Sequence, residues 1–413
     1  MSRTADVAII GGGIIGMCIA LQIARRSRLR VLVLEKGIGP GEGSTGASSA
    51  VCRYKYSRDE MVRLASAGIA AYKNWPQFLG IGDPAAAFHQ HGMLWLGDGK
   101  PDWPIREAQR LTALGVRAEV LDDAEIAARF PAINPCVVLP NLISAEEHDC
   151  VGGALHLLEV DGGYFDPMDA LQDLIRSARL RGVEVSFRSK VEGLSISNGR
   201  VAGIRLADGT EVKCGCLINA AGPWCNEVFD MAGLPCPWPL APTRIQIALV
   251  DRPPEVFGGL PVCADIRGGI YFRTQNRGQQ IIVGSVREED EQEAVADPGN
   301  YEKYADDDFI RTKLHALQHR IPSLKDFRNV RGYSGLYTVN RRDVHPIVGS
   351  TPIERFYVAN GFSGHGFKLA PAIGALVAKQ ITGVADEFDA EVDEAFLAFD
   401  RVPIDLPSKS VLA

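Results

Sequence analysis

Hydrophobic residues form an uncharged run near the start of the chain. The stretch 7–24, VAIIGGGIIGMCIALQIA, reaches the lower length limit for a membrane span or the core of a secretory leader. Its three consecutive glycines, 11–13, would each cost a continuous helix about 1 kcal/mol relative to alanine. Two arginines follow where a leader would have a cleavage site. We therefore expect no membrane span and divide the run into a buried strand over 5–10, a tight turn, and a helix over 14–25 that packs on the sheet.

The glycines of this turn fit the G-x-G-x-x-G pattern. Gly11 permits the turn, Gly13 lets a pyrophosphate approach the backbone, and Gly16 lets the helix lie close to the strand. A second β-prone run over 30–34, RVLVL, ends in Glu35, an acid about twenty residues on that can accept hydrogen bonds from both ribose hydroxyls. The pattern predicts a bound dinucleotide that contains adenosine.

A glycine- and hydroxyl-rich segment over 38–50, IGPGEGSTGASSA, follows Lys36. It is too polar and too rich in glycine for a strand, and its donors suit phosphate and ribose. An NAD enzyme would normally continue into another β-α unit, so this segment favours FAD. Because no second G-x-G-x-x-G occurs, we expect no NAD(P)H domain and infer that electrons enter from an organic substrate.

The same patterns predict elements further along the chain. Asp166 caps an amphipathic helix over 168–181, and Asp208 and Gly209 form the turn of a β-hairpin. The other expected elements are helices over 306–320 and 367–381 and an antiparallel strand pair around a turn at 276–278.

Length and composition bear on the number of domains, the possible partners and the state of the cysteines. With 413 residues, 46% of them hydrophobic, the chain exceeds what one core usually serves, so two domains are expected. A net charge of −7 argues against nucleic acid or an anionic membrane as a partner. The nine cysteines include no C-x-x-C pair, and no histidine cluster has zinc spacing. We expect reduced thiols, no metal site and a cytoplasmic protein.

Five segments in this order resemble the D-amino-acid oxidase superfamily of flavoproteins, and within it monomeric sarcosine oxidase and related amine oxidases and dehydrogenases. They are DVAIIGGGIIG with LVLEKG at the start, GGYFDPMDALQDLIRSARLRGVEV at 162–185, LINAAGPWCNEV at 217–228, GLYTVNRRDVHPIVG at 335–349 and NGFSGHGFKLAP at 360–371. The resemblance implies an α/β and α+β fold, in which a Rossmann-like FAD-binding domain is interleaved with an antiparallel-sheet substrate domain. The expected FAD-binding domain comprises 1–85, 152–236 and 330–400, the substrate domain 86–151 and 237–329, and a C-terminal tail 401–413.

The resemblance also implies which residues hold FAD. Val191 is expected beside the adenine through its backbone, and Ala221 and Gly222 at the cofactor's edge, although the segment around them also fits a plain strand-to-helix turn. The implied cofactor residues are Gly11, Gly13, Ile14, Ile15, Gly16, Glu35, Lys36, Ser44, Thr45, Ser48, Ser49, Val191, Ala221, Gly222, Trp224, Gly335, Tyr337, Gly364, His365, Gly366, Phe367 and Lys368.

Lys368 follows three glycines at the start of the last expected helix. A lysine in an arbitrary turn of this kind would be solvated. In sarcosine oxidase-like enzymes the matching lysine holds the substrate carboxylate together with an arginine, which corresponds here to Arg53. An arginine can clasp a carboxylate with two parallel hydrogen bonds while the lysine adds a point charge, which aims the adjacent C–H at the flavin. Tyr271, Arg273 and His365 are further candidate site residues.

Three departures from the sarcosine oxidase pattern limit what the resemblance implies. The cysteine that attaches the flavin falls at Gly335, so noncovalent FAD is expected. The lysine with which sarcosine oxidase activates oxygen falls near Phe272, where this sequence has no lysine, although Arg273 could supply a charge if it turned inward. The first of the two arginines of the sarcosine oxidase site falls near Ala50. The electron acceptor therefore stays open between oxygen and a quinone or protein, and a substrate other than sarcosine is expected.

The implied reaction is oxidation of the C–N bond of a small carboxylate-bearing amino acid, secondary or N-substituted, by hydride transfer to flavin N5. The product is an imine that water hydrolyses. No general base is needed if the amine binds deprotonated in a dry pocket. Two alternatives stay open: an FAD-dependent 2-hydroxy-acid dehydrogenase, in which His345 or His365 would act as base, and a flavin-binding assembly factor without turnover.

Overall fold

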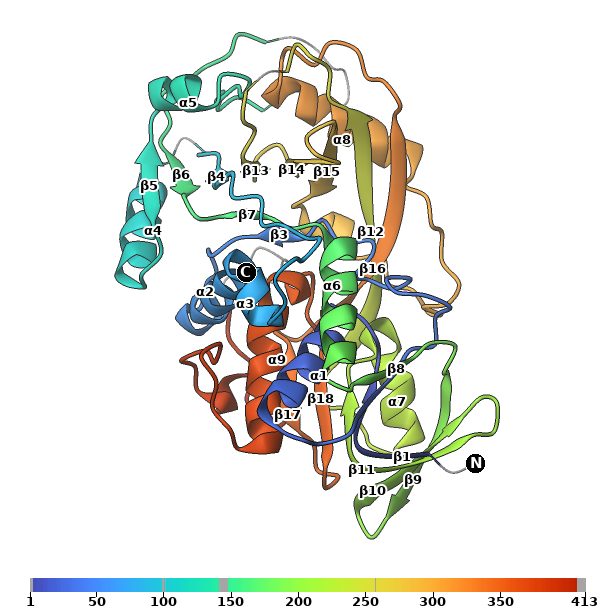
Figure 1. The fold of residues 1–413 in the computed structure, drawn as a ribbon. Coiled ribbons are helices and arrows are strands. Elements are labelled where there is room, and N and C mark those ends of the chain that lie inside the picture. Colours follow the sequence, from blue (N-terminus) through green and yellow to red (C-terminus); the bar gives the residue numbers. More distant parts are fainter. Residues whose placement is uncertain are drawn as a thin grey trace.

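A computed structural model describes residues 3–98, 100, 102–139, 141, 148–256 and 258–406. Two eight-stranded sheets lie toward opposite ends of the molecule (Figure 1). A two-stranded sheet of β3 (Val51–Cys52) and β7 (Gly163–Tyr164) lies between them. This mixture of parallel and antiparallel sheets with helices confirms the expected fold class.

The first sheet is built around the apolar strands at the start of the chain. β1 pairs in parallel with β2 and β11, and β11 pairs in parallel with β18, so four carboxyl ends meet at one edge. The strand order is β17 (Ile347–Ser350), β18 (Phe356–Asn360), β11 (Glu211–Asn219), β1 (Arg3–Ile10), β2 (Val31–Leu34) and β8 (Glu184–Ser186), with β10 (Arg200–Leu206) and β9 (Val191–Ser197) beyond β11. The hairpin predicted at Asp208 and Gly209 is confirmed, because β10 and β11 pair antiparallel on either side of that turn.

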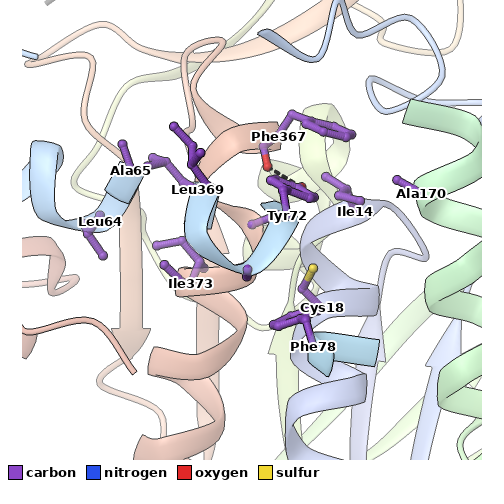
Figure 2. Close-up of a cluster of buried hydrophobic side chains, with 14 of the residues drawn as sticks. Ile14, Cys18, Leu64, Ala65, Tyr72, Phe78, Ala170, Phe367, Leu369 and Ile373 are labelled. Carbon is purple, nitrogen blue, oxygen red and sulfur yellow. Dashed lines mark hydrogen bonds between the residues drawn. The ribbon is translucent and has the colours of Figure 1, made fainter. Parts of the chain in front are cut away.

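Helices cover the first sheet and pack closely on one another. Figure 2 shows Ile14 and Cys18 of one helix lying beside Tyr72, Phe367 and Ile373 of two others in a buried cluster. The hydroxyl of Tyr72 donates a 2.7 Å hydrogen bond to the carbonyl of Phe367, which satisfies a buried polar group. The helices are α1 (Ile14–Arg26), α2 (Asp59–Lys73), α3 (Trp75–Leu79), α6 (Pro167–Leu180), α7 (Cys225–Met231) and α9 (Gly366–Thr382), with a short 3₁₀ turn η1 (Gly222–Trp224) before α7.

The second sheet is mostly antiparallel. Its order is β16 (Arg331–Asn340), β12 (Leu240–Asp251), β15 (Gln280–Ser285), β14 (Ile270–Gln275), β13 (Val262–Asp265), β4 (Met93–Trp95), β6 (His156–Glu159) and β5 (Ala118–Leu121). Its helices are α4 (Asp102–Ala113), α5 (Asp123–Arg129) and α8 (Asp307–Arg320), and the 3₁₀ turns η2 (Glu288–Glu291) and η3 (Glu394–Leu397) complete the described elements. The turn predicted at 276–278 is confirmed between β14 and β15.

Two strands lie in the second sheet although they come from stretches that the sequence assigns to FAD binding. β16 pairs with β12 along its whole length, from Leu240 opposite Asn340 to Leu249 opposite Arg331. β6 pairs with β4 and β5. Backbone hydrogen bonds therefore place both strands with the insertions, while the domain boundaries themselves stay a prediction.

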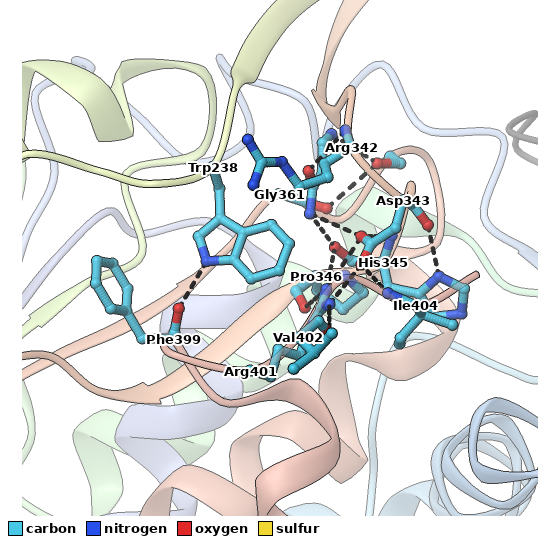
Figure 3. Close-up of polar contacts among 12 residues, drawn as sticks. Trp238, Arg342, Asp343, His345, Pro346, Gly361, Phe399, Arg401, Val402 and Ile404 are labelled. Atoms are coloured by element: carbon cyan, nitrogen blue, oxygen red, sulfur yellow. Dashed lines mark hydrogen bonds and ion pairs between the residues drawn. The ribbon is translucent and has the colours of Figure 1, made fainter. Parts of the chain in front are cut away.

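The described part of the predicted C-terminal tail is anchored to the first sheet's side of the molecule. Arg401 forms a nearly buried ion pair with Asp343, whose carboxylate also accepts a 2.9 Å hydrogen bond from the amide of Ile404 (Figure 3). The guanidinium of Arg401 lies 4.2 Å from the ring centre of Trp238. Among the described residues, no helix is both long and apolar enough to cross a membrane.

Candidate functional site

A cavity of about 340 Å³ opens at the carboxyl edge of the first sheet. Its lining comes from the residues that directly follow β1, β2 and β11, from the last residue of β18 and the loop after it, and from β16 of the second sheet. A crevice outside the carboxyl ends of parallel strands is where doubly wound folds bind their ligands. The volume lies within the range of cofactor sites.

The glycine turn after β1 forms one wall of this cavity and is sterically constrained. Gly11 has a φ of +110°, and a Cβ there would lie 2.2 Å from the carbonyl oxygen of Ala220. A Cβ on Gly16 would lie 2.0 Å from the carbonyl oxygen of Gly11, so only glycine lets α1 approach the turn. At Gly13 the nearest atom to a Cβ is the hydroxyl oxygen of Thr45 at 3.1 Å. The turn thus brings backbone without side chains to the cavity wall at the start of α1, which suits the close approach of a pyrophosphate.

Polar side chains are fixed around this turn. The Glu35 carboxylate accepts hydrogen bonds from the amides of Gly12 at 2.8 Å and Gly37 at 2.7 Å, which hold it at the cavity wall. The Thr45 hydroxyl accepts a 3.0 Å hydrogen bond from the amide of Ile14. The Lys36 ammonium lies 3.2 Å from the ring centre of Trp224, and its burial lowers its pKa. A carboxylate for ribose, amides for phosphate and an aromatic surface are the groups that an FAD dinucleotide requires.

Most of the predicted cofactor residues line the cavity. They are Gly11, Gly13, Ile14, Ile15, Glu35, Lys36, Ser44, Thr45, Ser48, Val191, Ala221, Gly222, Trp224, Tyr337, Gly364, Gly366 and Phe367. Gly16, Ser49, Gly335, His365 and Lys368 are not among the lining residues. Gly16 and Gly335 act through packing instead, since a Cβ on Gly335 would lie 2.5 Å from the side chain of Ala47.

Other lining residues were missed by the sequence analysis. Gly12, Asn360, Phe362 and Ser363 adjoin predicted residues, so the motifs could have indicated them. Tyr301 and Lys303 come from the second insertion, where no motif marks them. The Lys303 ammonium lies 3.3 Å from the ring centre of Tyr301. They reach the cavity because the segment before α8 runs beside β16, whose Ser334 amide donates a hydrogen bond to the Lys303 carbonyl.

The structure brings Arg53 and Lys368 together on one ring, although they come from opposite ends of the chain. The Arg53 guanidinium lies 4.3 Å from the ring centre of Tyr56, and the Lys368 ammonium lies 5.9 Å from the same centre. Lys368 is buried at the start of α9 and forms no hydrogen bond or ion pair with the described residues. Burial, with the charge of Arg53 second, lowers the pKa of Lys368 to about 7. Lys368 directly follows Gly366 and Phe367, which line the cavity.

A buried acid, Glu159 at the end of β6, belongs to this cluster and was missed by the sequence analysis. Its carboxylate accepts hydrogen bonds from the Trp95 indole at 2.7 Å and from the amides of Tyr54 at 2.5 Å and Lys55 at 3.0 Å, and its burial raises its pKa. The pKa of Lys55 is lowered by burial and then by Arg53. Three basic side chains near one acid leave the cluster suited to a further anion.

Of the remaining candidate residues, Tyr271 and Arg273 have their polar groups engaged in hydrogen bonds. The Tyr271 hydroxyl donates to the Ser49 hydroxyl at 3.0 Å, and Arg273 Nε donates to the Ser49 carbonyl at 2.5 Å. Arg273 also lies 4.4 Å from the ring centre of Tyr164, and desolvation lowers its pKa. His365 meets the Tyr56 ring edge-on at 5.1 Å.

His345 lies away from this cluster. Its Nδ1 lies 2.7 Å from the carbonyl oxygen of Asp343, and its ring packs edge-on against Phe396 at 6.0 Å. Of the two histidines considered as a base for a hydroxy acid, the structure therefore places His365 beside the cations.

Comparison with known proteins agrees with this geometry. Residues 6–380 match the family described as FAD dependent oxidoreductase (DAO). The chain belongs to this family. It is accordingly an FAD-dependent oxidoreductase, and the glycine turn, Glu35 and the cavity fit its cofactor.

Relatives and solved structures extend the similarity over almost the whole chain. The chain is 29% identical to FAD-dependent oxidoreductase domain-containing protein 1 of Mus musculus, over 91% of this chain and 80% of that protein. It is 26% identical to sarcosine oxidase subunit beta of Rhizobium meliloti (strain 1021), over 89% of this chain and 82% of that protein. The structure of L-proline dehydrogenase from P. horikoshii superposes with a TM-score of 0.80 at 24% identity, over 97% of this chain and 98% of that one, which shows a shared fold.

Proposed function

We propose that this protein oxidises the C–N bond of a carboxylate-bearing amino acid whose nitrogen is secondary or N-substituted. The observation that carries the proposal is the pair of cations, Arg53 and Lys368, on the ring of Tyr56 beside the cavity. The three basic side chains Arg53, Lys55 and Lys368 exceed the single acid Glu159, and a buried excess of positive charge is unfavourable unless a further anion joins it. A substrate carboxylate is an anion of the right size and charge.

The cofactor supplies the redox chemistry. When bound, FAD would supply hydride acceptance, so that the carbon next to the substrate nitrogen is oxidised to an imine that water hydrolyses. The residues that would hold FAD are the glycine turn at 11–13, the Glu35 carboxylate, and the loop around Gly364 and Gly366 at the start of α9.

The chain's own side chains would position the substrate. The Arg53 guanidinium, whose Nη1 donates to the carbonyl of Lys55, would supply a planar cation for the carboxylate, and Lys368 would add a compact charge. The carboxylate of the buried acid Glu159 is held by hydrogen bonds to Trp95 and the backbone. It can therefore offset part of the positive charge while leaving the place of the substrate carboxylate open. A site this dry also favours the neutral amine, which is the form that can lose a hydride.

The printed names of relatives support the substrate class. Sarcosine and L-proline, named for the similar subunit and the similar structure, both carry a secondary amine next to a carboxylate. No general base is required for such an amine, in agreement with the backbone-bound His345. The electron acceptor, oxygen or a quinone or protein, is not specified by these contacts.

Anaerobic mixing of the FAD-loaded protein with a panel of compounds tests the proposal. The panel contains sarcosine, proline, N,N-dimethylglycine, glycine and lactate, and the readout is loss of the flavin's visible absorbance. We expect one or more N-substituted or secondary amino acids to bleach the flavin, while lactate does not. Readmitting air, or adding a soluble quinone, then identifies the acceptor by the return of absorbance.

Variants separate substrate anchoring from flavin binding. Arg53→Met and Lys368→Met should keep bound FAD and bleach far more slowly at a given substrate concentration. Arg58→Met is the matched control, because Arg58 is exposed and pairs with Glu60 at 3.4 Å. Bleaching by lactate alone would favour the hydroxy-acid alternative, and a flavin that no compound reduces would favour an assembly factor.

A further inference from the structure

Two cysteines and a histidine meet outside the cavity, on the second sheet's side of the molecule. The ligand atoms of Cys136, His148 and Cys150 all lie within 4.8 Å of one another. Cys136 Sγ and His148 Nε2 are 3.5 Å apart, and both thiols are free. None of the three lines the cavity.

The spacing of these atoms matches the edge of a tetrahedral metal site. With Zn–S near 2.3 Å and Zn–N near 2.05 Å, a tetrahedral angle separates sulfur from nitrogen by about 3.6 Å. The observed separation of Cys136 Sγ and His148 Nε2 is 3.5 Å. Two sulfurs of such a site lie about 3.8 Å apart. Because the ligand atoms of the cluster lie within 4.8 Å of one another, Cys150 Sγ would have to move by at most about 1 Å to reach this distance from Cys136 Sγ.

The backbone that carries Cys136 is braced against the end of α8. Arg320 Nη1 donates to the carbonyl of Cys136 at 2.6 Å, and its Nε forms a buried 2.6 Å ion pair with Asp265. The Asn134 amide bonds to the Arg320 carbonyl at 2.8 Å, and the Asn134 side chain donates to the carbonyl of His319 at 3.0 Å. The first ligand is therefore held in place before any metal binds.

Donors also point at the two sulfurs. The amides of Val138 and Val151 each donate to Cys136 Sγ at 3.4 Å, and Asn134 Nδ2 donates to Cys150 Sγ at 3.2 Å. Hydrogen bonds of this kind orient the two ligand sulfurs. The paired backbones hold the two cysteines side by side, since the Val137 amide donates to the Val151 carbonyl at 2.8 Å.

We propose that Cys136, His148 and Cys150 bind one Zn²⁺ ion, with the fourth position facing solvent. Two thiolates and an imidazole are soft donors that favour zinc over magnesium or calcium. Cys150 is exposed, which gives the metal an entry path, and the ring of His319 packs against that of His148 at 4.9 Å and supports its orientation. The ion would join the 134–138 segment to 148–151 and to the end of α8, independently of the amino-acid oxidation proposed above.

Metal content tests this inference without any measurement of activity. The full-length, FAD-loaded protein is reduced, incubated with Zn²⁺, passed through a desalting column and analysed by elemental mass spectrometry. We expect one equivalent of zinc in the native protein and a loss of at least tenfold in Cys150→Ser and His148→Gln. Cys236→Ser is the matched control and should keep the metal, because Cys236 is half-buried and lies outside the cluster.

Cobalt gives an independent spectroscopic readout. Replacing Zn²⁺ by Co²⁺ should produce a thiolate charge-transfer band and the visible bands of a tetrahedral ion, and both should disappear in Cys150→Ser. The inference is overturned if the native protein retains no more zinc than Cys150→Ser. It is also overturned if peptide mapping of alkylated native protein shows a disulfide between Cys136 and Cys150. Because Cys150 is exposed, its variant should fold, which circular dichroism checks.

Discussion

At the scale of single residues, the buried charge of Lys368, which we propose binds the substrate, lowers the stability of the protein. Burial and the neighbouring Arg53 lower its pKa to about 7. An unfolded lysine keeps its proton up to a pKa near 10.4, so the unfolded chain binds more protons between pH 7 and pH 10. The free energy of unfolding therefore rises with pH across this window, and below pH 7 the buried charge exerts its full penalty. The carboxylate of the proposed substrate would offset this penalty.

This charge predicts how carboxylate binding depends on pH. A carboxylate that lacks an amine, such as acetate, should bind the FAD-loaded protein best below pH 7, and its Kd should rise by up to about tenfold per pH unit above that value. Lys368→Met should weaken binding by roughly 10- to 100-fold and abolish this pH dependence, since a charged hydrogen bond contributes about 1.5–3 kcal/mol. The perturbation of the flavin spectrum by acetate gives the Kd. A native Kd that stays constant from pH 6 to pH 9 would contradict the assignment.

Sequence motifs indicated some of these residues and missed others for a physical reason. Lys368 lies in a segment that a known family shares, and Arg53 follows the glycine- and hydroxyl-rich segment at 38–50, so both could be found one by one. Glu159 lies at the end of a short strand, and only the folded chain brings its carboxylate to the amides of Tyr54 and Lys55. Local patterns carry no information about such long-range contacts.

At the scale of elements, the contact between α1 and α9 positions both helix starts at the cavity. Gly374 lies where the two helices approach most closely, because a Cβ there would be 2.7 Å from the backbone carbonyl carbon of Cys18. Figure 2 shows the neighbouring side chains Cys18 and Ile373 in this packed region. The first residues of α1 and α9 line the cavity, so the distance between the helices also sets its width.

Gly374→Ala tests this contact. The added methyl group forces the helices apart, and we expect a loss of about 1–3 kcal/mol in the free energy of unfolding together with weaker FAD binding. Lys379→Ala is the control on the same helix: its ion pair with Glu394 is exposed at 3.4 Å, so its loss should cost at most about 1 kcal/mol. Urea unfolding and titration of the apoprotein with FAD give the two quantities. Equal effects of the two substitutions would show that the close approach is unimportant.

The limits of helices were predicted better than the pairing of strands. The helices of α1, α6, α8 and α9 begin and end within one or two residues of their predicted limits, because apolar periodicity and capping residues are local signals. The partner of β16 was not predicted, since its apolar residues would suit either sheet. Its pairing with β12 is non-local, because β13, β14 and β15 lie between the two strands in the chain.

At the scale of the whole molecule, residues from distant parts of the chain complete the cavity wall. Arg401 binds Asp343, and the side-chain amide of Asn340 donates to the same carboxylate at 3.0 Å. The backbone amide of Asn340 in turn donates to the hydroxyl of Ser363, which lines the cavity, at 3.0 Å. The C-terminal segment therefore supports the loop that precedes α9, as the polar contacts in Figure 3 illustrate around Asp343.

Removing Arg401 should destabilise the protein and loosen this loop. The Asp343 side chain has no exposed surface and that of Arg401 is 5% exposed, so Arg401→Ala leaves a buried charge unpaired at a cost of about 3–5 kcal/mol. Asp343→Asn combined with Arg401→Ala should lose less than the two single changes added together, because the buried charge is gone.

Arg176→Ala breaks an exposed pair with Asp83 at 3.0 Å and should cost at most about 1 kcal/mol. Urea unfolding gives these free energies, and titration with FAD should show weaker binding in Arg401→Ala. If Arg401→Ala were clearly destabilised but bound FAD as tightly as the native protein, the ion pair would contribute to stability alone. The hydrogen bonds from Asp343 through Asn340 to Ser363 require that both stability and FAD affinity fall.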